Sequence, residues 1–172
     1  MAKRTILTAP DLRLKAKGKD VEKVDGDIRR LIDDMLETMY AADGVGLAAV
    51  QIGVALNVVV MDIAQKEGRN EPQAFINPKI LLASEETAKF EEGCLSVPDI
   101  WEEVTRHAAI RAEYLDRDGN QQTVEADGFL ADCLQHEIDH LSGKLFIDHL
   151  SRLKRAMALK KLEKAKRQKE LA

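Results

Sequence analysis

The segment that decides the fold is Gln135-His136-Glu137-Ile138-Asp139-His140, which lies inside a stretch of helical periodicity at residues 128–141. Residues four positions apart lie one above the other on one face of an α-helix, so the two histidines face the same side. Their imidazoles can bind one transition-metal ion, and Glu137 can act as a general base without being a ligand. The segment therefore predicts a metal-binding helix, which Gly143 is expected to end.

The His-Glu-x-x-His pattern is fairly specific. With 4 histidines and 30 acidic residues among 172, a match with Asp or Glu at the second position is expected by chance at about the 1–2% level. An ordinary helix whose two histidines make local hydrogen bonds is the alternative, so further ligands are needed to support a metal site.

A catalytic site of this type needs three protein ligands and one open position. A longer pattern would place a third histidine at position 146, but Phe146 stands there and cannot bind a metal. Glu163 and Glu170 lie in a basic terminal segment without a supporting motif. A cysteine is therefore the expected third ligand.

The chain has two cysteines, and helix geometry makes one of them the better candidate for the third ligand. Cys133 shares a face with the histidines but lies about 10.5 Å from His140 along the axis, at 1.5 Å per residue. Its short side chain is therefore expected to pack beside the site. Cys94 lies in the irregular segment Glu92-Gly93-Cys94-Leu95-Ser96-Val97-Pro98, which can bring a thiolate against the helix. Cys94 is the better candidate, and a free cysteine buried in a loop is the alternative.

The segment Gly44-Val45-Gly46-Leu47-Ala48-Ala49-Val50-Gln51 fits a dinucleotide-binding loop only superficially. That fingerprint requires a strand before the loop and a helix after it, whereas here the order is reversed. Gly44 and Gly46 are instead expected to let the backbone approach a bound chain closely. Gln51 is a candidate oxyanion donor, with an ordinary polar group at a strand end as the alternative.

Segments 44–51, 92–96 and 135–140 together resemble, in this order, the motifs of the peptide deformylase family, and the resemblance extends over about residues 5–155. It implies an α+β fold with antiparallel strands around the metal-binding helix. It also implies a metal-dependent hydrolase that removes the formyl group from N-formylmethionyl nascent peptides and releases formate. Fe²⁺ is the ion usually found in this family, and Zn²⁺, Ni²⁺ or Co²⁺ would also suit the ligands.

The resemblance also implies roles for single residues. The metal ligands become Cys94, His136 and His140, with Glu137 as the general base. Gln51 and the backbone N–H of Leu95 become the oxyanion donors, and Gly46 and Arg106 are expected to face the peptide. Asp132 departs from the family, where this position is often apolar. It is expected to point outward as a solvated charge, because a buried unpaired aspartate is rare.

Composition and charge limit the class of protein. A chain of 172 residues with 45% hydrophobic residues and two cysteines is expected to form one domain over residues 1–172, without a disulfide framework. It has no apolar run of the roughly 20 residues that a membrane helix needs, and no signal peptide is apparent. A cytoplasmic monomer is expected. Residues 151–172 carry nine Lys or Arg against two Glu, so this tail is a candidate contact with ribosomal RNA.

Local patterns predict the other elements. An extended arm is expected over residues 5–24, and hydrophobic periodicity predicts a helix at 27–41, capped by Asp25 or Asp27. Strands are expected at 54–62, 73–83, 100–115 and 145–148, and residues 116–120 form a hairpin signal before a strand at 122–124. Ser151 is expected to cap a last helix that ends near residue 168 and docks through Leu153, Met157 and Leu162.

Two other functions use the same features. A zinc endopeptidase would use the same helix to cleave internal peptide bonds, although the downstream ligand of that class is absent from the sequence. A non-catalytic RNA- or ribosome-binding module with a structural metal would explain the basic tail, but a structural site usually has four protein ligands.

Overall fold

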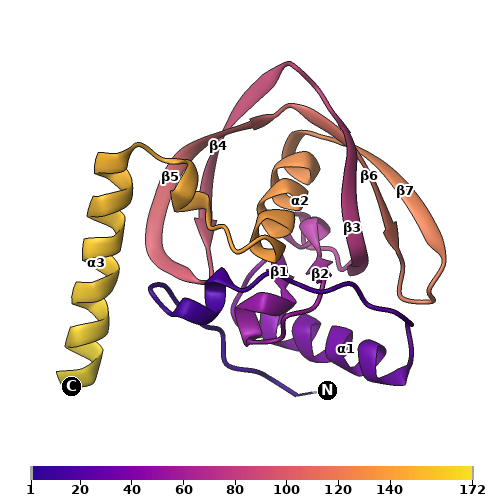
Figure 1. Cartoon of the computed structure of the whole chain (residues 1–172), viewed down its shortest axis with the longest axis horizontal. Helices are drawn as coiled ribbons and strands as arrows, with labels where there is room; N and C mark the ends of the chain where they lie inside the picture. Colours follow the sequence, from indigo (N-terminus) through magenta and orange to yellow (C-terminus); the bar gives the residue numbers. More distant parts are fainter. Residues whose placement is uncertain (1, 172) are drawn as a thin grey trace.

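The computed structural model describes residues 2–171 and confirms an α+β fold in which antiparallel strands surround a central helix (Figure 1). The larger sheet has five strands in the order β1-β2-β3-β6-β7, and a separate hairpin pairs β4 with β5. The strands are β1 (Gly46–Ala48), β2 (Val58–Met61), β3 (Gln73–Ala83), β4 (Thr87–Cys94), β5 (Val97–His107), β6 (Ala109–Leu115) and β7 (Gln121–Asp127). The helices are α1 (Gly26–Ala41), α2 (Gly128–Leu141) and α3 (Arg152–Leu171).

The N-terminal helix forms as its pattern predicts. Asp25 caps α1 by accepting a hydrogen bond from the backbone N–H of Ile28. The apolar stripe of α1, formed by Ile28, Leu31, Ile32, Met35 and Met39, is buried and packs against residues of β1 and β2, among them Leu47 and Val58. Burial of this stripe fixes α1 beneath the larger sheet (Figure 1).

The central helix α2 lies between the larger sheet and the β4–β5 hairpin (Figure 1). Ala131 and Leu134 are fully buried in a core cluster with Val59 and Phe75 of the sheet. The helix ends at Leu141, and Gly143 follows with a φ of 77°. A Cβ atom on Gly143 would lie 2.5 Å from the Lys15 carbonyl oxygen, so this close turn requires glycine.

Several strand predictions were wrong in their bounds. The predicted strand at 100–115 is two strands, because the chain turns at Ala108 and passes from the β4–β5 hairpin into the larger sheet. The prediction of a strand at 145–148 is wrong, because residues 146–149 form a 3-10 turn in which the neighbouring residues Phe146 and Ile147 are both buried. A strand with one face exposed would instead alternate between buried and exposed positions. The predicted strand at 54–62 shortens to residues 58–61, and β1 and β4 were not predicted.

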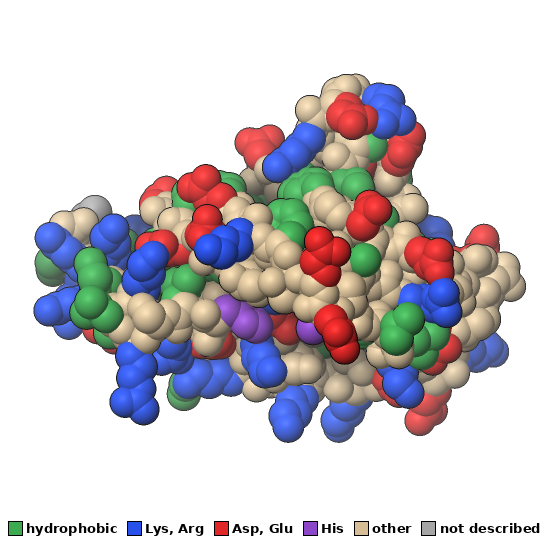
Figure 2. Space-filling view, turned by 90° about the horizontal axis from the view of Figure 1, so that it is seen from above, with side chains coloured by type: hydrophobic (Ala, Val, Ile, Leu, Met, Phe, Trp, Pro, Cys, Tyr) green, Lys and Arg blue, Asp and Glu red, His purple; other side chains and the backbone are tan. Residues whose placement is uncertain are grey.

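The basic C-terminal helix starts as predicted, but of its three predicted docking residues only Leu162 is buried. Ser151 Oγ accepts a hydrogen bond from the backbone N–H of Lys154 at the start of α3. Ala158 and Leu162 are buried beside β5, whereas Leu153 and Met157 are 72% and 54% exposed. The expected docking role of those two residues is therefore wrong. Lys and Arg side chains surround the end of the molecule that α3 forms (Figure 2).

Within residues 2–171, no helix has the length and apolar character that crossing a membrane requires.

Candidate metal centre

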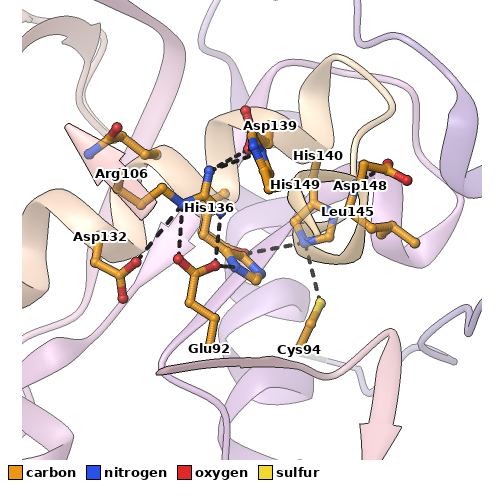
Figure 3. A network of polar contacts seen from close by, with 12 residues as sticks. Glu92, Cys94, Arg106, Asp132, His136, Asp139, His140, Leu145, Asp148 and His149 are labelled. Atoms are coloured by element: carbon orange, nitrogen blue, oxygen red, sulfur yellow. Dashed lines mark hydrogen bonds and ion pairs between the residues drawn. The ribbon is translucent and has the colours of Figure 1, made fainter. Parts of the chain in front are cut away.

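Three side chains converge where the end of β4 meets α2. One ligand atom each from Cys94, His136 and His140 lies within 4.8 Å of the other two. Cys94 Sγ is 3.4 Å from His140 Nε2 (Figure 3). Two ligands at about 2.3 and 2.1 Å from an ion, with a tetrahedral angle between them, would be about 3.6 Å apart. The spacing of Cys94 and His140 therefore suits two ligands of one metal ion, and His136 lies close enough to be the third.

Cys133 lies outside this group of ligands. Its side chain is buried in the core cluster between α2 and the larger sheet. Burial raises the pKa of the Cys133 thiol, so the neutral form is favoured. This placement agrees with the expected packing role, and it leaves Cys94 as the thiol that faces the histidines.

Glu92 fixes the orientation of one histidine. Its Oε1 lies 2.8 Å from His136 Nδ1, so that ring can present its other nitrogen to the ligand group. Arg106 donates to the same carboxylate from Nε at 2.9 Å and from Nη2 at 2.8 Å. Burial opposes ionisation of Glu92, but hydrogen bonds from Arg106 and His136 outweigh it and hold its pKa well below the usual range.

Glu92 was missed by the sequence analysis. Glu92 and Cys94 are two residues apart on β4, so they share one face of the strand. Treating residues 92–98 as a loop hid this relation, and recognition of strand β4 would have found it.

Arg106 was expected to face the peptide, but it is not among the residues that line the cavity. Its side chain is only 4% exposed. Besides Glu92, it contacts Asp139 Oδ2 at 2.6 Å, and His149 Nε2 lies 2.7 Å from the same oxygen. Arg106 lies on the face of β5 that packs against α2, where buried acids attract a cation (Figure 3).

Asp132 also differs from the expectation. It is buried on the cavity wall, with Oδ1 4.0 Å from Arg106 Nε, and is not a solvated surface charge. It lies one turn before His136, so the helix places both on the face toward the hairpin. Burial and then a hydrogen bond with Glu92 raise the pKa of Asp132 to about 8. Within residues 2–171, its Oδ1 has no hydrogen-bond partner.

Glu137 lies beside the ligand residues, with its Oε1 3.8 Å from His140 Nε2. Its carboxyl group is buried, and within the described part of the chain its Oε2 has no hydrogen-bond partner. Burial raises the pKa of Glu137 to about 7, which suits proton transfer near neutral pH. A Cβ atom on Gly46 would lie 2.9 Å from Glu137 Oε2. The absence of a side chain at Gly46 therefore leaves room for this carboxylate.

Gln51 is held with its amide nitrogen toward the ligand group. Its Oε1 accepts a hydrogen bond from the Ala48 backbone N–H at 2.9 Å, which fixes the amide plane. Its Nε2 lies 3.0 Å from Ser96 Oγ and 3.6 Å from Cys94 Sγ. Leu95 follows Cys94 directly, and both Gln51 and Leu95 line the cavity.

The cavity in front of these groups has a volume of about 460 Å³. This is the range of a small-molecule or short-peptide site. Its wall includes Gly46, Cys94 and Glu137, together with the apolar side chains of Ile100 and Phe129. The arrangement joins a candidate ion site, a base and a fixed donor in one cleft, as metal-assisted hydrolysis requires.

Comparison with known proteins agrees with this chemistry. The family described as polypeptide deformylase matches residues 3–156. A peptide deformylase of Agrobacterium fabrum is 54% identical over 98% of this chain and 99% of its own length. Another, of Phenylobacterium zucineum, is 56% identical over 95% of this chain and 97% of its own.

Solved structures show the same fold. The peptide deformylase of Ehrlichia chaffeensis in complex with actinonin has a TM-score of 0.92 and 47% identity. The alignment covers 97% of this chain and 99% of that one. The peptide deformylase of Legionella pneumophila has a TM-score of 0.91 and 48% identity over 98% of both chains.

Proposed function

Since the chain belongs to the polypeptide deformylase family, we propose how its residues divide the work of the reaction. The activity is metal-dependent removal of the N-terminal formyl group from newly made polypeptides. The observation that supports the assignment of residues is the convergence of Cys94, His136 and His140 in one group of ligand atoms, beside the buried Glu137.

We assign the ion to these three ligands and propose Fe²⁺ as the resident metal. One thiolate and two imidazoles also suit Zn²⁺, Ni²⁺ and Co²⁺. When bound, the ion supplies Lewis acidity, which lowers the pKa of water and polarises the formyl group. Glu92 and Arg106 contribute by holding His136 in the required orientation.

Glu137 is the proposed general base. Its buried carboxylate accepts a proton from the attacking water, and it then delivers this proton to the departing amine. The unpartnered Oε2 of Glu137 supports this role, because within residues 2–171 no hydrogen bond holds that oxygen away from the cavity. The products are formate and a peptide with a free N-terminus.

Gln51 Nε2 and the Leu95 backbone N–H are the proposed donors to the oxygen of the formyl group as negative charge develops on it. The fixed amide of Gln51 supports this role, because a donor already held in place needs no reorganisation during the reaction. The backbone at Gly46, which lines the cavity, is the proposed contact with the main chain of the substrate.

The test is release of formate from formyl-Met-Ala-Ser, measured beside the metal content of the same preparation. We expect turnover in proportion to bound metal, and loss of turnover with a chelator. Cleavage of internal bonds in unformylated peptides would instead support an endopeptidase. A metal-loaded protein that hydrolyses neither substrate would support a structural metal.

The basic tail at residues 151–172 is the proposed contact with the ribosome, where the formylated substrate emerges. Most of its Lys and Arg side chains are exposed along α3, which supports contact with RNA phosphates. We further propose that the protein acts in the cytoplasm, because it meets its substrates during translation. We also propose that it acts as a monomer.

A further inference from the structure

His149 is the outer end of a polar network that reaches the candidate ligand His136 through Asp139, Arg106 and Glu92 (Figure 3). The His149 side chain is 34% exposed, and its Nε2 lies 2.7 Å from Asp139 Oδ2. The backbone turns back after α2, which brings the 3-10 turn of residues 146–149 beside that helix. The polar network therefore starts at the surface of the molecule and ends at the candidate metal centre.

Every link of this polar network is short. Arg106 Nη1 is 2.6 Å from Asp139 Oδ2, and Nε and Nη2 of the same guanidinium contact Glu92 at 2.9 and 2.8 Å. Glu92 Oε1 in turn lies 2.8 Å from His136 Nδ1. The side chains of Arg106 and Glu92 are 4% and 3% exposed, and charged hydrogen bonds are strong where water is excluded. The position of each group therefore depends on the groups on both sides of it.

His149 gives the carboxylate of Asp139 a second donor. A carboxylate oxygen only accepts hydrogen bonds, so Nε2 of His149 carries the hydrogen in this contact. Asp139 Oδ2 is thereby held by an imidazole from the 3-10 turn and by a guanidinium from β5. Because the Asp139 side chain is itself 22% exposed, loss of the imidazole would admit water and let the carboxylate change its rotamer.

Arg106 carries this restraint inward because its guanidinium is planar and rigid. The donors of an arginine have a fixed arrangement, so holding Nη1 on Asp139 also fixes the directions of Nε and Nη2. A competing acid lies nearby, since Asp132 Oδ1 is 4.0 Å from Arg106 Nε and within residues 2–171 has no hydrogen-bond partner. Rotation of the guanidinium toward Asp132 would weaken its two hydrogen bonds to Glu92.

We propose that His149 is a positioning residue for the metal centre. It holds Asp139 and, through that carboxylate, Arg106. Arg106 keeps Glu92 in place, and Glu92 orients the ring of His136. This inference rests on the proposed function, which makes His136 a metal ligand. Direct partners of ligand residues change metal affinity by about 10–100-fold, and His149 acts through further residues from a partly exposed position, so its effect is expected to be smaller.

A purely structural role for His149 predicts a loss of stability without a loss of metal affinity. The 3-10 turn has other anchors, because Asp148 Oδ1 accepts a hydrogen bond from Arg155 Nε at 2.9 Å. Phe146 and Ile147 are also buried in a core cluster that includes residues of β5. Replacement of His149 should therefore leave the turn in place, so its effect on the metal centre can be measured in folded protein.

The primary experiment measures affinity for Zn²⁺ by competition with a chelator, which requires no turnover. His149→Leu should weaken this affinity by about three- to tenfold. His149→Gln should stay within about twofold of the unchanged protein, because Nε2 of glutamine is as many bonds from Cβ as Nε2 of histidine and also donates. His107→Leu is the matched control. It removes an exposed imidazole that contacts the Ser84 carbonyl oxygen, outside the polar network, and should leave the affinity unchanged.

A double-mutant cycle tests whether His149 acts through Glu92. In Glu92→Gln protein, where one charged partner of Arg106 is lost, adding His149→Leu should change the affinity by less than about twofold. With metal saturating, both His149 variants should keep the KM for formyl-Met-Ala-Ser, because His149 is not among the described residues that line the cavity. Thermal unfolding of the metal-free variants measures stability separately.

Equal affinities of His149→Leu and the unchanged protein would overturn the inference and leave the deformylase activity intact. Equal losses in His149→Leu and His149→Gln, or a full further loss in the Glu92→Gln background, would also overturn it, because His149 would then not act as a donor through Glu92. A metal-binding protein that releases no formate would count against the proposed function, while the chelator competition still decides the role of His149.

Discussion

Helices α2 and α3 are both rich in polar side chains, but α2 buries many of them inside the fold, whereas α3 exposes most of them to solvent. Eight of the 14 residues of α2 are buried, whereas in the 20 residues of α3 only Ala158 and Leu162 are buried among those described. His136 and Asp139 of α2 meet partners from β4 and β5 (Figure 3). The lysines and arginines of α3 instead face solvent over most of their length.

The difference shows that burial inside the fold, more than the residue types of a helix, shifts the pKa of a carboxyl group toward the range that catalysis uses. Burial raises the pKa of Glu137 to about 7. Glu163 of α3 is exposed, and a carboxylate in such a position interacts only weakly with its neighbours. Substitutions on α2 and on the strands against it should therefore change chemistry, and those on α3 should change association.

The largest expected effect separates the two cysteines. Cys94→Ser should lose bound metal and activity together, because a serine hydroxyl is a poor ligand at neutral pH. Cys133→Ser should retain the metal and cost about 1–3 kcal/mol of stability, since it places a hydroxyl in an apolar core. Metal analysis and thermal unfolding of both variants check this. Metal loss in Cys133→Ser alone would reverse the assignment.

Glu137→Gln should lower kcat by about 10²–10⁴-fold while leaving metal content near that of the unchanged protein. The amide has almost the same shape but cannot accept the proton. Formate release per bound metal is the measurement. Near-normal turnover in the loaded variant would exclude Glu137 as the base.

Gln51→Leu should lower kcat by about 10²–10³-fold with bound metal retained, because one fixed donor to the developing oxyanion is lost. The same assay of formate release per metal applies. An effect confined to KM would show that Gln51 binds substrate and does not stabilise the transition state.

Glu92→Gln should weaken metal affinity by about 10–100-fold, because the charged partner of His136 Nδ1 is lost. Glu163→Gln on α3 is the matched control and should leave affinity unchanged. Competition with a chelator measures both. Equal affinities in the two variants would show that Glu92 supports folding only.

The smallest effect on hydrolysis is expected on α3. Lys164, Lys166, Arg167 and Lys169, all changed to Gln, should alter kcat/KM for short formyl peptides by less than about twofold. The same change should reduce co-sedimentation with ribosomes at low salt, with a weaker salt dependence. It keeps Leu162, whose burial anchors the helix.

The matched control changes Lys3, Lys15, Lys17 and Lys23 to Gln, which removes the same charge from exposed positions outside the tail. It should leave ribosome binding nearly intact. Equal losses in the two variants would mean that net charge, and not the tail, governs the association.

The sequence alone determined the parts of the protein that depend on local spacing. The i, i+4 histidines required a helix, and α2 spans the predicted residues 128–141. The apolar period of residues 27–41 predicted α1 within one residue at its start. The charge of the tail was also evident. These features need only neighbours within a turn or two, so their physics is present in the sequence itself.

Tertiary structure decided where polar residues from different segments meet. The pairing of β4 with β5 brings Glu92 and Cys94 to α2, and it turns Arg106 away from the cavity into contact with Glu92 and Asp139. The same packing buries Asp132, which by composition alone belonged on the surface. A one-residue change of register would move every one of these strand side chains to the opposite face. Such contacts depend on pairing between distant segments, which local spacing does not specify.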